Sequence, residues 1–372
     1  MRIDFVADAV YPFHNGGKEK RLHDLATALV DQGHEVHVHT MHWWSDPAPT
    51  HVVGGVVMHA LCRVHPLYAG DRRSIKQALL FSLACLRLAR VPFEVLDVDH
   101  MPYFPLLTAR IACGLRRKPL YATWHEALDA DSWRRYMGPI GVIAFAIERI
   151  TSRLPRAIGT ASAQTRRNLA SHHRRTRGVR LVGTGVDLDT IATTQPAAEP
   201  TDILFVGRLV KDKQVALLLD AMALIRAQRP GTTCTIIGRG IEEDRLRAQV
   251  ERLGLGDAVR MIGWLAESHD VYAHMKSAKV FALPSNREGF GMVVAEALAC
   301  GTPVVTIDSP ENASQHLINP GVSGSVTAND PRAFADGLLE WLDRSDKLDP
   351  EDAGTLDLAW PSIAARQLEV YT

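Results

Sequence analysis

Residues 285–301 read SNREGFGMVVAEALACG, and this stretch is the strongest indication of the fold because it joins an expected strand to an expected helix. The run before it, residues 279–284, is apolar, rich in β-forming residues and ends at a proline, which predicts a buried strand. Gly289 and Gly291 allow the loop backbone conformations that are closed to other residues. Residues 292–300 have a helical composition and precede a C-capping glycine. The stretch therefore predicts a strand, a glycine loop and a helix.

Two carboxylates, Glu288 and Glu296, lie eight positions apart across this loop and helix start. The free N–H groups at the helix start and the positive end of its dipole favour an anion there, most naturally a phosphate. Glu288 in the loop and Glu296 about one turn into the helix would accept hydrogen bonds from neutral hydroxyls beside that phosphate. This combination suits a nucleotide sugar. A structural alternative stays open, in which Glu288 is only a favourable helix charge and Glu296 is solvated.

The same segment resembles the acidic motif of glycosyltransferase family 4, the glycosyl transferases group 1, in which seven residues separate two glutamates. Residues 295–305, AEALACGTPVV, are similar to the family's pattern almost residue for residue. Members are retaining enzymes with the GT-B fold. The resemblance implies that Glu288 contacts the donor sugar, that Glu296 contacts the ribose hydroxyls, and that nearby amides face the diphosphate. The donor-binding residues expected in this segment are Glu288, Gly289, Phe290, Gly291, Met292, Val293 and Glu296.

Two cations, Arg208 and Lys213, follow the strand expected at residues 203–206. A leaving nucleoside diphosphate gains negative charge as the glycosidic bond breaks, so cations there would stabilise the transition state more than the ground state. Taken alone, two basic residues in a loop are more often solvated. The resemblance implies donor binding and catalysis for both. Gln214 departs from the pattern because a glycine is usual there, which leaves the start of the next helix open.

The first lobe contributes a second glycine loop and a histidine. Gly16 and Gly17 lie between the first expected strand and helix, and the resemblance implies that their loop closes on the donor phosphates. The loop lacks the G-x-G-x-x-G spacing of a dinucleotide fold, which disfavours a dehydrogenase. His125 follows an expected strand and resembles the family's Thr-x-His segment, which implies positioning of donor sugar and acceptor rather than covalent catalysis. Glu126, where a small residue is common, departs from the pattern.

Strands and helices alternate through most of the chain, which predicts parallel sheets with helices on both faces. The alternation pauses near residues 183–200 and restarts at residue 203, so we expect a linker there. The predicted architecture is α/β and GT-B, with two facing Rossmann-like domains and a cleft between them. The first comprises residues 1–185 with a returning C-terminal helix over 357–372 and binds the acceptor. The second, residues 186–356, binds the donor.

Composition excludes several classes of protein. Lys plus Arg and Asp plus Glu are 42 each among 372 residues, so the chain lacks the basic excess of a nucleic-acid binder and we expect no nucleic-acid partner. Five scattered cysteines fit buried thiols rather than disulfides or a zinc site, and no apolar run reaches the roughly 20 residues that span a bilayer. We therefore expect a cytoplasmic protein that is neither secreted nor integral to a membrane.

Three further patterns suggest a metal site or a membrane contact. His34, His37, His39 and His42 resemble a metal cluster, but strand geometry places only His37 and His39 on one face, so no metal site is expected. Asp97 and Asp99 mimic the metal site of another glycosyltransferase fold and are expected simply to line the acceptor side. We expect a single helix over residues 131–153. Its residues 133–150, like residues 72–90, combine arginines with wide apolar faces; we favour core packing, with peripheral contact at the inner membrane face as the alternative.

These observations predict a metal-independent, retaining hexosyltransferase that needs no cofactor. It would move a sugar from a UDP- or GDP-hexose to a hydroxyl of a glycan, glycolipid or small-molecule glycoside by a front-face mechanism. The catalytic residues expected are His125, Glu288, Arg208 and Lys213. A nucleotide-sugar 2-epimerase of the same fold and a non-catalytic nucleotide-sugar-binding partner protein remain the alternatives. Donor base, sugar, acceptor and oligomeric state are not specified by the sequence.

Overall fold

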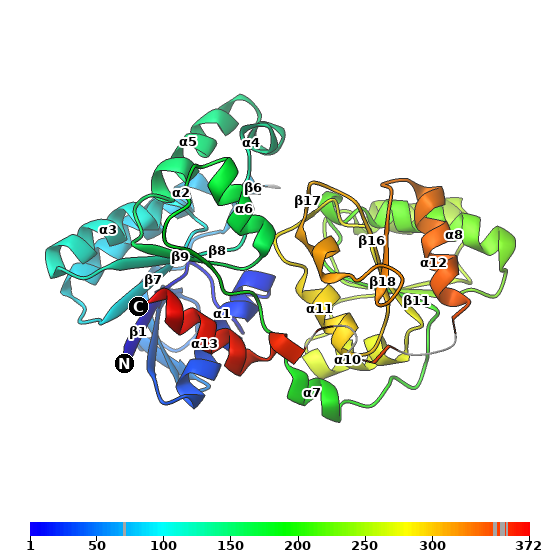
Figure 1. Ribbon diagram of the computed structural model, residues 1–372, viewed down its shortest axis with the longest axis horizontal. Helices are drawn as coiled ribbons and strands as arrows, with labels where there is room; N and C mark the ends of the chain where they lie inside the picture. The colour runs from blue at the N-terminus through cyan, green and yellow to red at the C-terminus, as the bar shows by residue number, and fades with distance from the viewer. Residues whose placement is uncertain (70–71, 345–347, 350–353, 355) are drawn as a thin grey trace. The chain divides into compact units, whose positions relative to one another are not determined.

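The computed structural model describes residues 1–69, 72–344, 348, 349, 354 and 356–372 (Figure 1). Its internal contacts divide the chain into two compact units. Unit 1 comprises Met1–Gly185 together with Trp360–Thr372, and unit 2 comprises Val186–Ala359. Each unit has its own sheet and its own hydrophobic core, and each is described by itself below.

Unit 1 is built on an eight-stranded sheet in the order β10-β9-β8-β7-β1-β2-β4-β3. All described neighbours are parallel except β3, which returns antiparallel along β4 as a hairpin. The strands are β1 (Arg2–Val6), β2 (Glu35–His42), β3 (Thr50–Val53), β4 (Val56–Arg63), β7 (Val95–Asp99), β8 (Leu120–Trp124), β9 (Ala157–Thr160) and β10 (Val179–Leu181). A short hairpin, β5 (Tyr68–Ala69) with β6 (Arg72–Arg73), lies outside this sheet. Parallel strands align their carboxyl ends at one edge of the sheet, which is where side chains that follow the strands gather.

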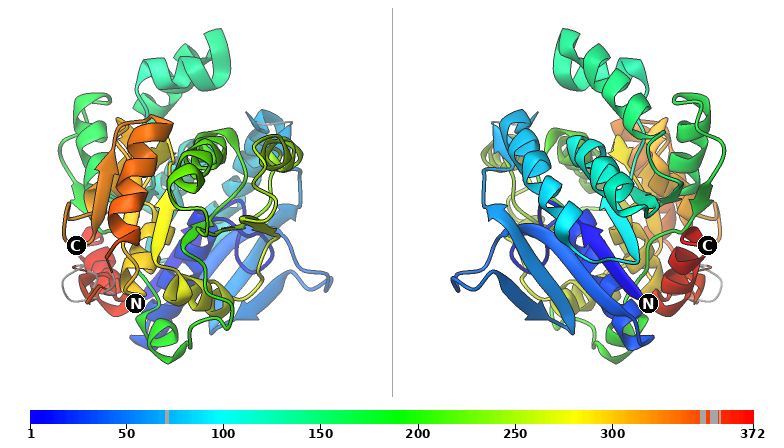
Figure 2. Two further views of the ribbon diagram at one scale, coloured as in Figure 1. Left: turned by 90° about the vertical axis from the view of Figure 1, so that its right-hand side faces the viewer. Right: turned by 90° about the vertical axis from the view of Figure 1, so that its left-hand side faces the viewer.

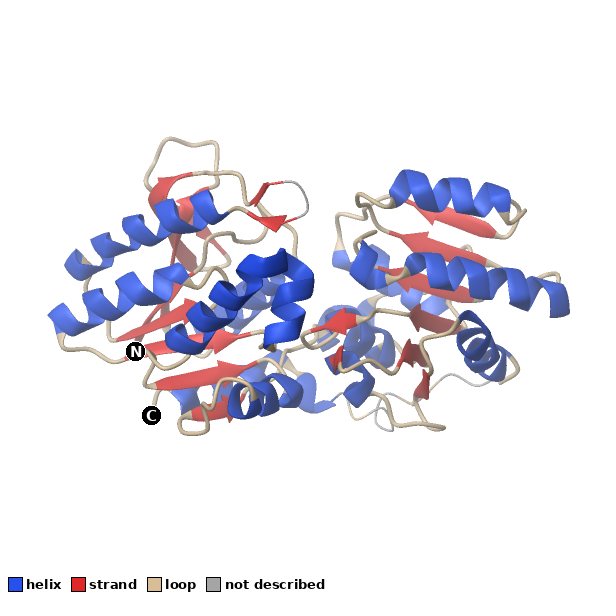
Figure 3. Cartoon of the chain, turned by 90° about the horizontal axis from the view of Figure 1, so that it is seen from above, coloured by secondary structure: helices blue, strands red, loops and turns tan. Residues whose placement is uncertain are grey.

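Helices cover both faces of the sheet of unit 1 (Figure 3). They are α1 (Gly17–Asp31), α2 (Ile75–Ala84), α3 (Phe104–Arg116), α4 (Ala130–Met137), α5 (Gly141–Thr151) and α6 (Ala163–Ser171), with 3-10 turns η1 (Cys85–Arg90) and η2 (Gly138–Ile140). Alternate residues of the central strand enter opposite cores: Phe5 packs with Leu25 and Val38 on one face, and Val6 packs with Leu96 and Leu106 on the other.

A single helix over residues 131–153 was predicted, and this prediction is wrong. The chain breaks between α4 and α5 at Gly138, whose φ of 68° lies in the left-handed region. Gly141 approaches the earlier helix so closely that an added Cβ would lie 2.2 Å from the carbonyl oxygen of Trp133. Two glycines therefore turn one apolar-rich segment into a helical hairpin.

The last helix, α13 (Trp360–Val370), belongs to unit 1 and packs against α1. The Tyr371 hydroxyl and the Gln367 amide each donate a 2.9 Å hydrogen bond to Oδ2 of the buried Asp97. The Tyr121 hydroxyl donates to the Tyr371 carbonyl at 2.8 Å. The predicted return of the C-terminal helix is therefore confirmed, although the helix begins at residue 360 and not at 357.

Unit 2 is a six-stranded parallel sheet in the order β13-β12-β11-β14-β16-β18. Its strands are β11 (Ile203–Val206), β12 (Cys234–Ile237), β13 (Val259–Ile262), β14 (Val280–Leu283), β16 (Val304–Ile307) and β18 (Gly324–Thr327). Its helices are α7 (Leu188–Thr193), α8 (Val215–Gln228), α9 (Glu243–Arg252), α10 (Ser268–Ser277), α11 (Met292–Ala299) and α12 (Pro331–Leu342). The strand, glycine loop and helix that were predicted around residues 279–300 are present as β14, its loop and α11.

The linker expected over residues 183–200 requires a correction in its second part, residues 193–200. The two units part at Gly185 and Val186, and α7 follows at once. The Ala197 N–H then donates to the Ala273 carbonyl at 2.9 Å, which fixes this proline-containing stretch on unit 2. The loose composition thus marks a loop that is bound to the second unit rather than the connection between the units.

Candidate active site

Two loops meet at the carboxyl edge of the sheet of unit 2. One follows β11 and carries Arg208 and Lys213; the other follows the neighbouring strand β14 and carries Glu288. The Asn286 N–H donates a 2.8 Å hydrogen bond to the Asp212 carbonyl, which ties the loops through their backbones. The Lys213 ammonium also forms an ion pair with Glu288. The structure therefore joins two residues that lie 75 positions apart in the sequence.

The Lys213–Glu288 pair is shielded from solvent. The side chains are 16% and 12% exposed, respectively, so the pair is less screened by water than an ordinary surface ion pair. Glu288 lies in the two-residue strand β15 (Arg287–Glu288), which pairs with β17 (Glu311–Asn312) and so fixes the backbone of the loop. Both side chains still retain partial access to water, and the carboxylate can accept further hydrogen bonds from a ligand.

The start of α11 is open at this edge. Its N-cap is Gly291, with a φ of 93°, and no side chain caps the first turn. A Cβ at Gly291 would lie 2.3 Å from the Cβ of Ser314, so both the backbone conformation and the space require glycine here. The N–H groups of the first turn, at Met292 and Val293, are thus uncovered by any capping side chain and provide the local charge that favours a phosphate.

Glu296 and Arg208 occupy different environments. Glu296 lies partly buried on α11, where the hydroxyl of the buried Tyr272 donates to its Oε1 at 3.3 Å. Arg208 is exposed, and within the described residues its guanidinium has no hydrogen bond or ion pair. Glu296 is therefore held in place by α10, whereas Arg208 is free to engage an anion.

Gln214, where the sequence pattern would place glycine, is the N-cap of α8 with φ 47° and ψ 40°. This left-handed conformation is one that glycine adopts without penalty and other residues adopt at a cost. The side-chain Oε1 of Gln214 is also buried without a hydrogen-bond partner. The helix nevertheless begins at Val215, so the departure changes the local energy but not the position of the helix.

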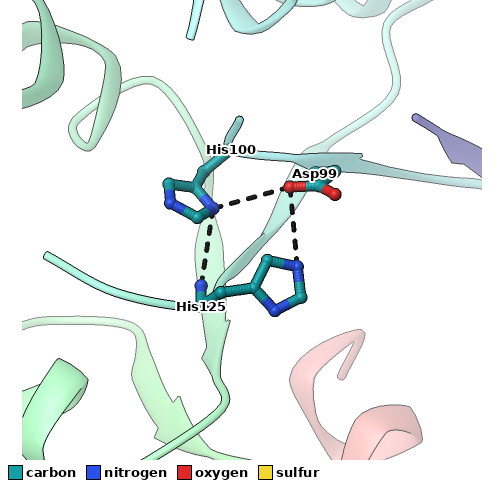
Figure 4. Close-up of side chains that lie close together, drawn as sticks. All are labelled: Asp99, His100 and His125. Atoms are coloured by element: carbon teal, nitrogen blue, oxygen red, sulfur yellow. Dashed lines mark hydrogen bonds and ion pairs between the residues drawn. The ribbon is translucent and has the colours of Figure 1, made fainter. Parts of the chain in front are cut away.

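In unit 1, His125 lies directly after β8 and faces Asp99, which ends β7 (Figure 4). His125 Nε2 and Asp99 Oδ1 are 3.5 Å apart, and the His125 N–H lies 3.4 Å from Nδ1 of His100. His100 itself stacks on Trp124, with ring centroids 4.9 Å apart. Behind this group is a cavity with room for about one water molecule, lined in part by Arg21, Asp97 and Thr123.

Lys18 links this histidine group to the rest of the carboxyl edge. Its ammonium lies 2.9 Å from Asp8 Oδ1 and 3.2 Å from Asp99 Oδ2, and it donates to the Met101 carbonyl at 3.3 Å. Burial would lower the pKa of Lys18, but the surrounding carboxylates raise it above its ordinary value. Burial would raise the pKa of Asp99, but the Lys18 and His125 charges hold it well below its ordinary value. Arg73 completes the network with a 3.0 Å ion pair to Asp8 Oδ2.

Gly16 and Gly17 open α1, with Gly16 as an extended N-cap and Gly17 as the first helical residue. An added Cβ at Gly16 would lie 2.3 Å from Oε2 of Glu19, so a larger residue would have to displace that carboxylate. Burial would raise the pKa of Glu19, but Lys18 and a hydrogen bond with His14 lower it to about 2. This helix start therefore already has an anionic neighbour, and a role for Gly16 and Gly17 in donor binding stays a prediction.

Asp99, His100 and His125 are the one group in the described ranges whose carboxylate and imidazole atoms lie close enough to hold a metal ion. The histidines that the sequence suggested as a cluster behave differently. His37 Nδ1 lies 2.8 Å from Nε2 of His59, and His39 Nε2 lies 2.8 Å from Asp4, while no such contact joins His34 or His42 to them. All five cysteines are free thiols, as expected.

Sequence reasoning missed Lys18, Asp8, Arg73 and His100. Asp8 follows the first strand, so its place at the carboxyl edge was available from the strand prediction. Arg73 belongs to a small hairpin whose contact with Asp8 depends on tertiary packing, and no local pattern signals it. Lys18 lies between Gly17 and Glu19, a position that gives no indication of the three carboxylates around it.

Two family models match this chain. The model described as "Glycosyltransferase Family 4" matches residues 15–190, and "Glycosyl transferases group 1" matches residues 189–352. The chain belongs to this family of glycosyltransferases. The family assignment that the acidic motif suggested is therefore confirmed.

Two relatives of this glycosyltransferase align with nearly its whole length. It is 28% identical to the D-inositol 3-phosphate glycosyltransferase of Thermobispora bispora over 96% of this chain and 90% of that protein. It is also 28% identical to a glycogen synthase of Mycobacterium tuberculosis over 100% of this chain and 94% of the relative.

Solved structures show the same fold. Sucrose-phosphate synthase from Thermosynechococcus elongatus aligns with a TM-score of 0.77 at 20% identity, covering 100% of this chain and 98% of that one. HepE from Anabaena, solved in complex with UDP, aligns with a TM-score of 0.75 at 18% identity and covers 99% of each chain. The glycosyltransferase thus has the GT-B fold. None of the helices in the described ranges has the length and apolar character needed to cross a bilayer.

Proposed function

We propose that this glycosyltransferase moves a hexose from a UDP- or GDP-hexose to an acceptor hydroxyl with retention of configuration. The observation that carries the proposal is the junction in unit 2, where Lys213, in the loop after β11, pairs with Glu288, in the loop that leads to the uncapped start of α11. This junction offers a cation, a hydrogen-bond acceptor and a phosphate-binding helix end together. In support, the HepE structures, which share the fold, contain UDP and UDP-glucose.

The diphosphate would bind at the first turn of α11, with Arg208 and Lys213 as its cations. Negative charge builds on the diphosphate as the bond to the sugar breaks, so these groups act most strongly in the transition state. Because Lys213 is already paired with Glu288, its ammonium is held in position before the donor arrives. Such preorganisation reduces the reorganisation that the reaction requires.

The glutamates would bind neutral parts of the donor. Glu288 retains acceptor capacity beside Lys213 and would receive hydrogen bonds from sugar hydroxyls. Glu296 would receive them from the ribose hydroxyls, while Tyr272 fixes its carboxylate. Neither carboxylate is proposed as a covalent nucleophile; the leaving phosphate would help to deprotonate the acceptor on the same face of the sugar. Isolation of a covalent sugar–enzyme adduct would contradict this mechanism.

In unit 1 we propose that His125 positions the sugar and the acceptor hydroxyl, and that Asp99 orients its imidazole. Asp99 lies between the imidazoles of His100 and His125 on one oxygen and the Lys18 ammonium on the other. Lys18 thereby supplies a permanent positive charge at a place where a divalent ion would otherwise balance the carboxylate. We therefore propose that the reaction is metal-independent, with activity that persists in the presence of a chelator.

The first experiment is a donor panel. The protein would be mixed, with a chelator present, with UDP-, GDP- and ADP-sugars, and donor binding and nucleoside diphosphate release would be measured by thermal shift and product analysis. We expect one nucleotide class to stabilise the protein and to be cleaved faster with acceptor sugars present. Lys213→Met should abolish both effects, whereas Lys211→Met, an exposed lysine of the same loop, should retain them. Stabilisation without any product would favour the non-catalytic binding protein, and a rearranged nucleotide sugar would favour the epimerase.

A further inference from the structure

Two neighbouring helices of unit 1 carry an uncovered apolar surface. Seven large apolar side chains on α2, η1 and α3 are between 39% and 72% exposed, although leucine and isoleucine are normally among the buried residues. We call this surface the α2–α3 ridge; its members are Ile75, Leu79, Leu83, Leu86, Leu107, Ile111 and Leu115. Isolated exposed leucines need no explanation, but a contiguous set of this size marks an interaction surface.

The spacing of these residues makes the ridge continuous. Ile75, Leu79 and Leu83 recur every four residues on α2, as do Leu107, Ile111 and Leu115 on α3, so each set forms one stripe along its helix. The helices pack side by side (Figure 2, right), and Ser82 Oγ lies 3.3 Å from Thr108 Oγ1 between them. An α-helix turns by about 100° per residue, so Ser82 lies next to the apolar stripe of α2 and Thr108 lies next to that of α3. The two stripes therefore adjoin across this hydrogen bond.

The opposite faces of the same helices pack into the core of unit 1. The exposed residues of the ridge are therefore not the core-facing residues of helices that are wrongly oriented. Phe81 and Leu88 on one segment and Leu106 and Ala109 on the other are fully buried. Each helix is thus apolar on two sides, one packed against the sheet and one facing outward.

Basic residues flank the ridge. Lys76 lies beside the stripe of α2, and Arg110 lies beside the stripe of α3, each on the side away from the neighbouring helix. Both side chains are exposed. Exposed Arg90, Arg117 and Lys118 follow at the far ends of the two segments. Residues 72–93 and 100–119 contain no aspartate or glutamate. The next acidic residue after the first segment, Glu94, accepts a hydrogen bond from the Arg2 N–H at 3.1 Å.

We propose that the α2–α3 ridge docks unit 1 on an anionic lipid bilayer. Its leucines and isoleucines would enter the boundary between headgroups and acyl chains, and its lysines and arginines would meet lipid phosphates. The charge pattern selects this partner. A second copy of the chain, docked through the same face, would bring like charges together, and a nucleic acid would leave the seven apolar side chains uncovered.

A second apolar surface, around Ile140, Val142, Ile143 and Ile150, is comparably exposed but carries a different charge pattern. Asp131 lies in the adjoining helix and pairs with Arg134 at 3.0 Å, so this surface is not uniformly basic. We therefore assign bilayer contact to the ridge and not to residues 133–150. The assignment does not depend on the reaction that the enzyme catalyses.

Vesicle flotation tests the proposal, with phosphatidylcholine vesicles that contain or lack phosphatidylglycerol. Wild-type protein should float with the anionic vesicles, and raised salt should weaken binding because it screens the lysines and arginines. Leu83→Gln combined with Leu115→Gln should lower the partition coefficient at least about tenfold. The matched control is Ile143→Gln combined with Ile150→Gln, since Ile143 is 60% exposed and Leu83 is 61% exposed. That control should float like the wild type.

Several outcomes would overturn the proposal: no flotation of the wild-type protein on anionic vesicles, equal binding to neutral vesicles, or loss of binding in the Ile143/Ile150 control alone. Analytical ultracentrifugation of the same proteins without lipid provides a second test. A dimer that dissociates in the Leu83/Leu115 variant would assign the ridge to self-association and contradict the lipid partner. Because all four substituted residues are exposed, unchanged thermal unfolding should accompany each variant.

Discussion

At the scale of single residues, Glu288 is the position where the donor sugar would be recognised. Its carboxylate lies in a short strand pairing and contacts Lys213, so its geometry is set by the fold and not by a ligand. A carboxylate is acceptor-only, whereas an amide of the same shape also donates. Glu288→Gln, the neutral isostere, can therefore be used to test the recognition of the sugar separately from the recognition of the diphosphate.

We expect Glu288→Gln to lower kcat/KM by a factor on the order of 10²–10³, in the range found when one stabilising group is removed from an active site. Binding of the free nucleoside diphosphate should change little, because the new amide oxygen can still accept a hydrogen bond from Lys213, and α11 and Arg208 remain. Isothermal titration with nucleoside diphosphate and with the nucleotide sugar would separate the two effects. Equal weakening of both ligands would place Glu288 at the diphosphate and contradict its assignment to the sugar.

Gln214 gives a prediction about stability. Gln214→Gly removes a left-handed non-glycine conformation, which costs about 1–2 kcal/mol, and a buried side-chain oxygen without a partner. The greater freedom of glycine in the unfolded chain offsets about 0.5–1 kcal/mol of that gain. We expect a net stabilisation of up to about 1 kcal/mol in urea unfolding. A lower unfolding midpoint would show that the glutamine side chain contributes stabilising contacts that outweigh the backbone cost.

At the scale of elements, α13 shows how a remote helix is attached to a sheet. Asp97, in the middle of β7, is buried and receives hydrogen bonds from Tyr371, Gln367 and Thr123. Burial raises the pKa of Asp97 to about 6, although the hydrogen bonds from Tyr371 and Thr123 act in the opposite direction. The three donors thus stabilise a carboxylate that the interior alone would disfavour.

Tyr371→Phe should destabilise unit 1 by about 1–3 kcal/mol, since it removes one donor and leaves a buried carboxylate oxygen with fewer partners. The Tyr371 carbonyl would still accept from Tyr121, so the helix should remain attached. The measurement is thermal unfolding of the full chain. Tyr136→Phe, an aromatic substitution on partly buried α4, provides a comparison that should have a smaller effect.

The elements themselves were largely predictable because hydrophobic periodicity is local. The strands expected over residues 203–206 and 279–284 agree with β11 and β14 to within one residue at each end. The helix expected over residues 131–153 failed because composition does not reveal that Gly138 and Gly141 permit a hairpin. Among the elements that were not identified are helices α3, α6, α7, α10 and α12 and strands β3, β4, β10, β16 and β18. The α2–α3 ridge could not be predicted, since exposure is a property of the packed unit.

The candidate site was predictable in unit 2 and much less so in unit 1. Glu288, Lys213 and the glycine N-cap each belong to a contiguous motif, so they could be identified from the sequence. The network around Lys18 consists of residues from separate segments, including Asp8, Arg73 and Asp99, which only the folded sheet brings together. A sequence motif identifies functional residues that are close together in the sequence. It does not indicate which separate segments come into contact in the folded sheet.

At the scale of the whole molecule, stability should depend on pH through Glu148. This glutamate is buried between Trp133 Nε1 at 2.6 Å and Trp124 Nε1 at 3.4 Å. Burial raises its pKa to about 8. Between its unfolded pKa, about 4.3, and the folded value, only the folded state retains the proton. Its contribution to stability is therefore complete at low pH and is lost as the pH rises toward 8.

Each pH unit within that window costs up to about 1.4 kcal/mol from this group. Glu148→Gln removes the titration, so between about pH 6.5 and 8 we expect the wild type to lose about 1–2 kcal/mol relative to the variant. Urea unfolding at both pH values measures this difference. The quantity to compare is the change in unfolding free energy with pH in the two proteins. A constant cost of placing an amide near the two tryptophans does not affect this slope. Parallel slopes would show that Glu148 is ionised in the folded protein.

The closure of unit 1 by α13 has a consequence for how the protein is made. Residues 360–372 leave the ribosome only after all of unit 2, yet Asp97 needs Gln367 and Tyr371 as partners. During synthesis the core of unit 1 therefore lacks Ile363 and Ala364 until the last residues are made. All residues of the sheet of unit 2 are available before that point. The nascent chain would thus complete unit 2 before unit 1, the reverse of the order in which their first residues are translated.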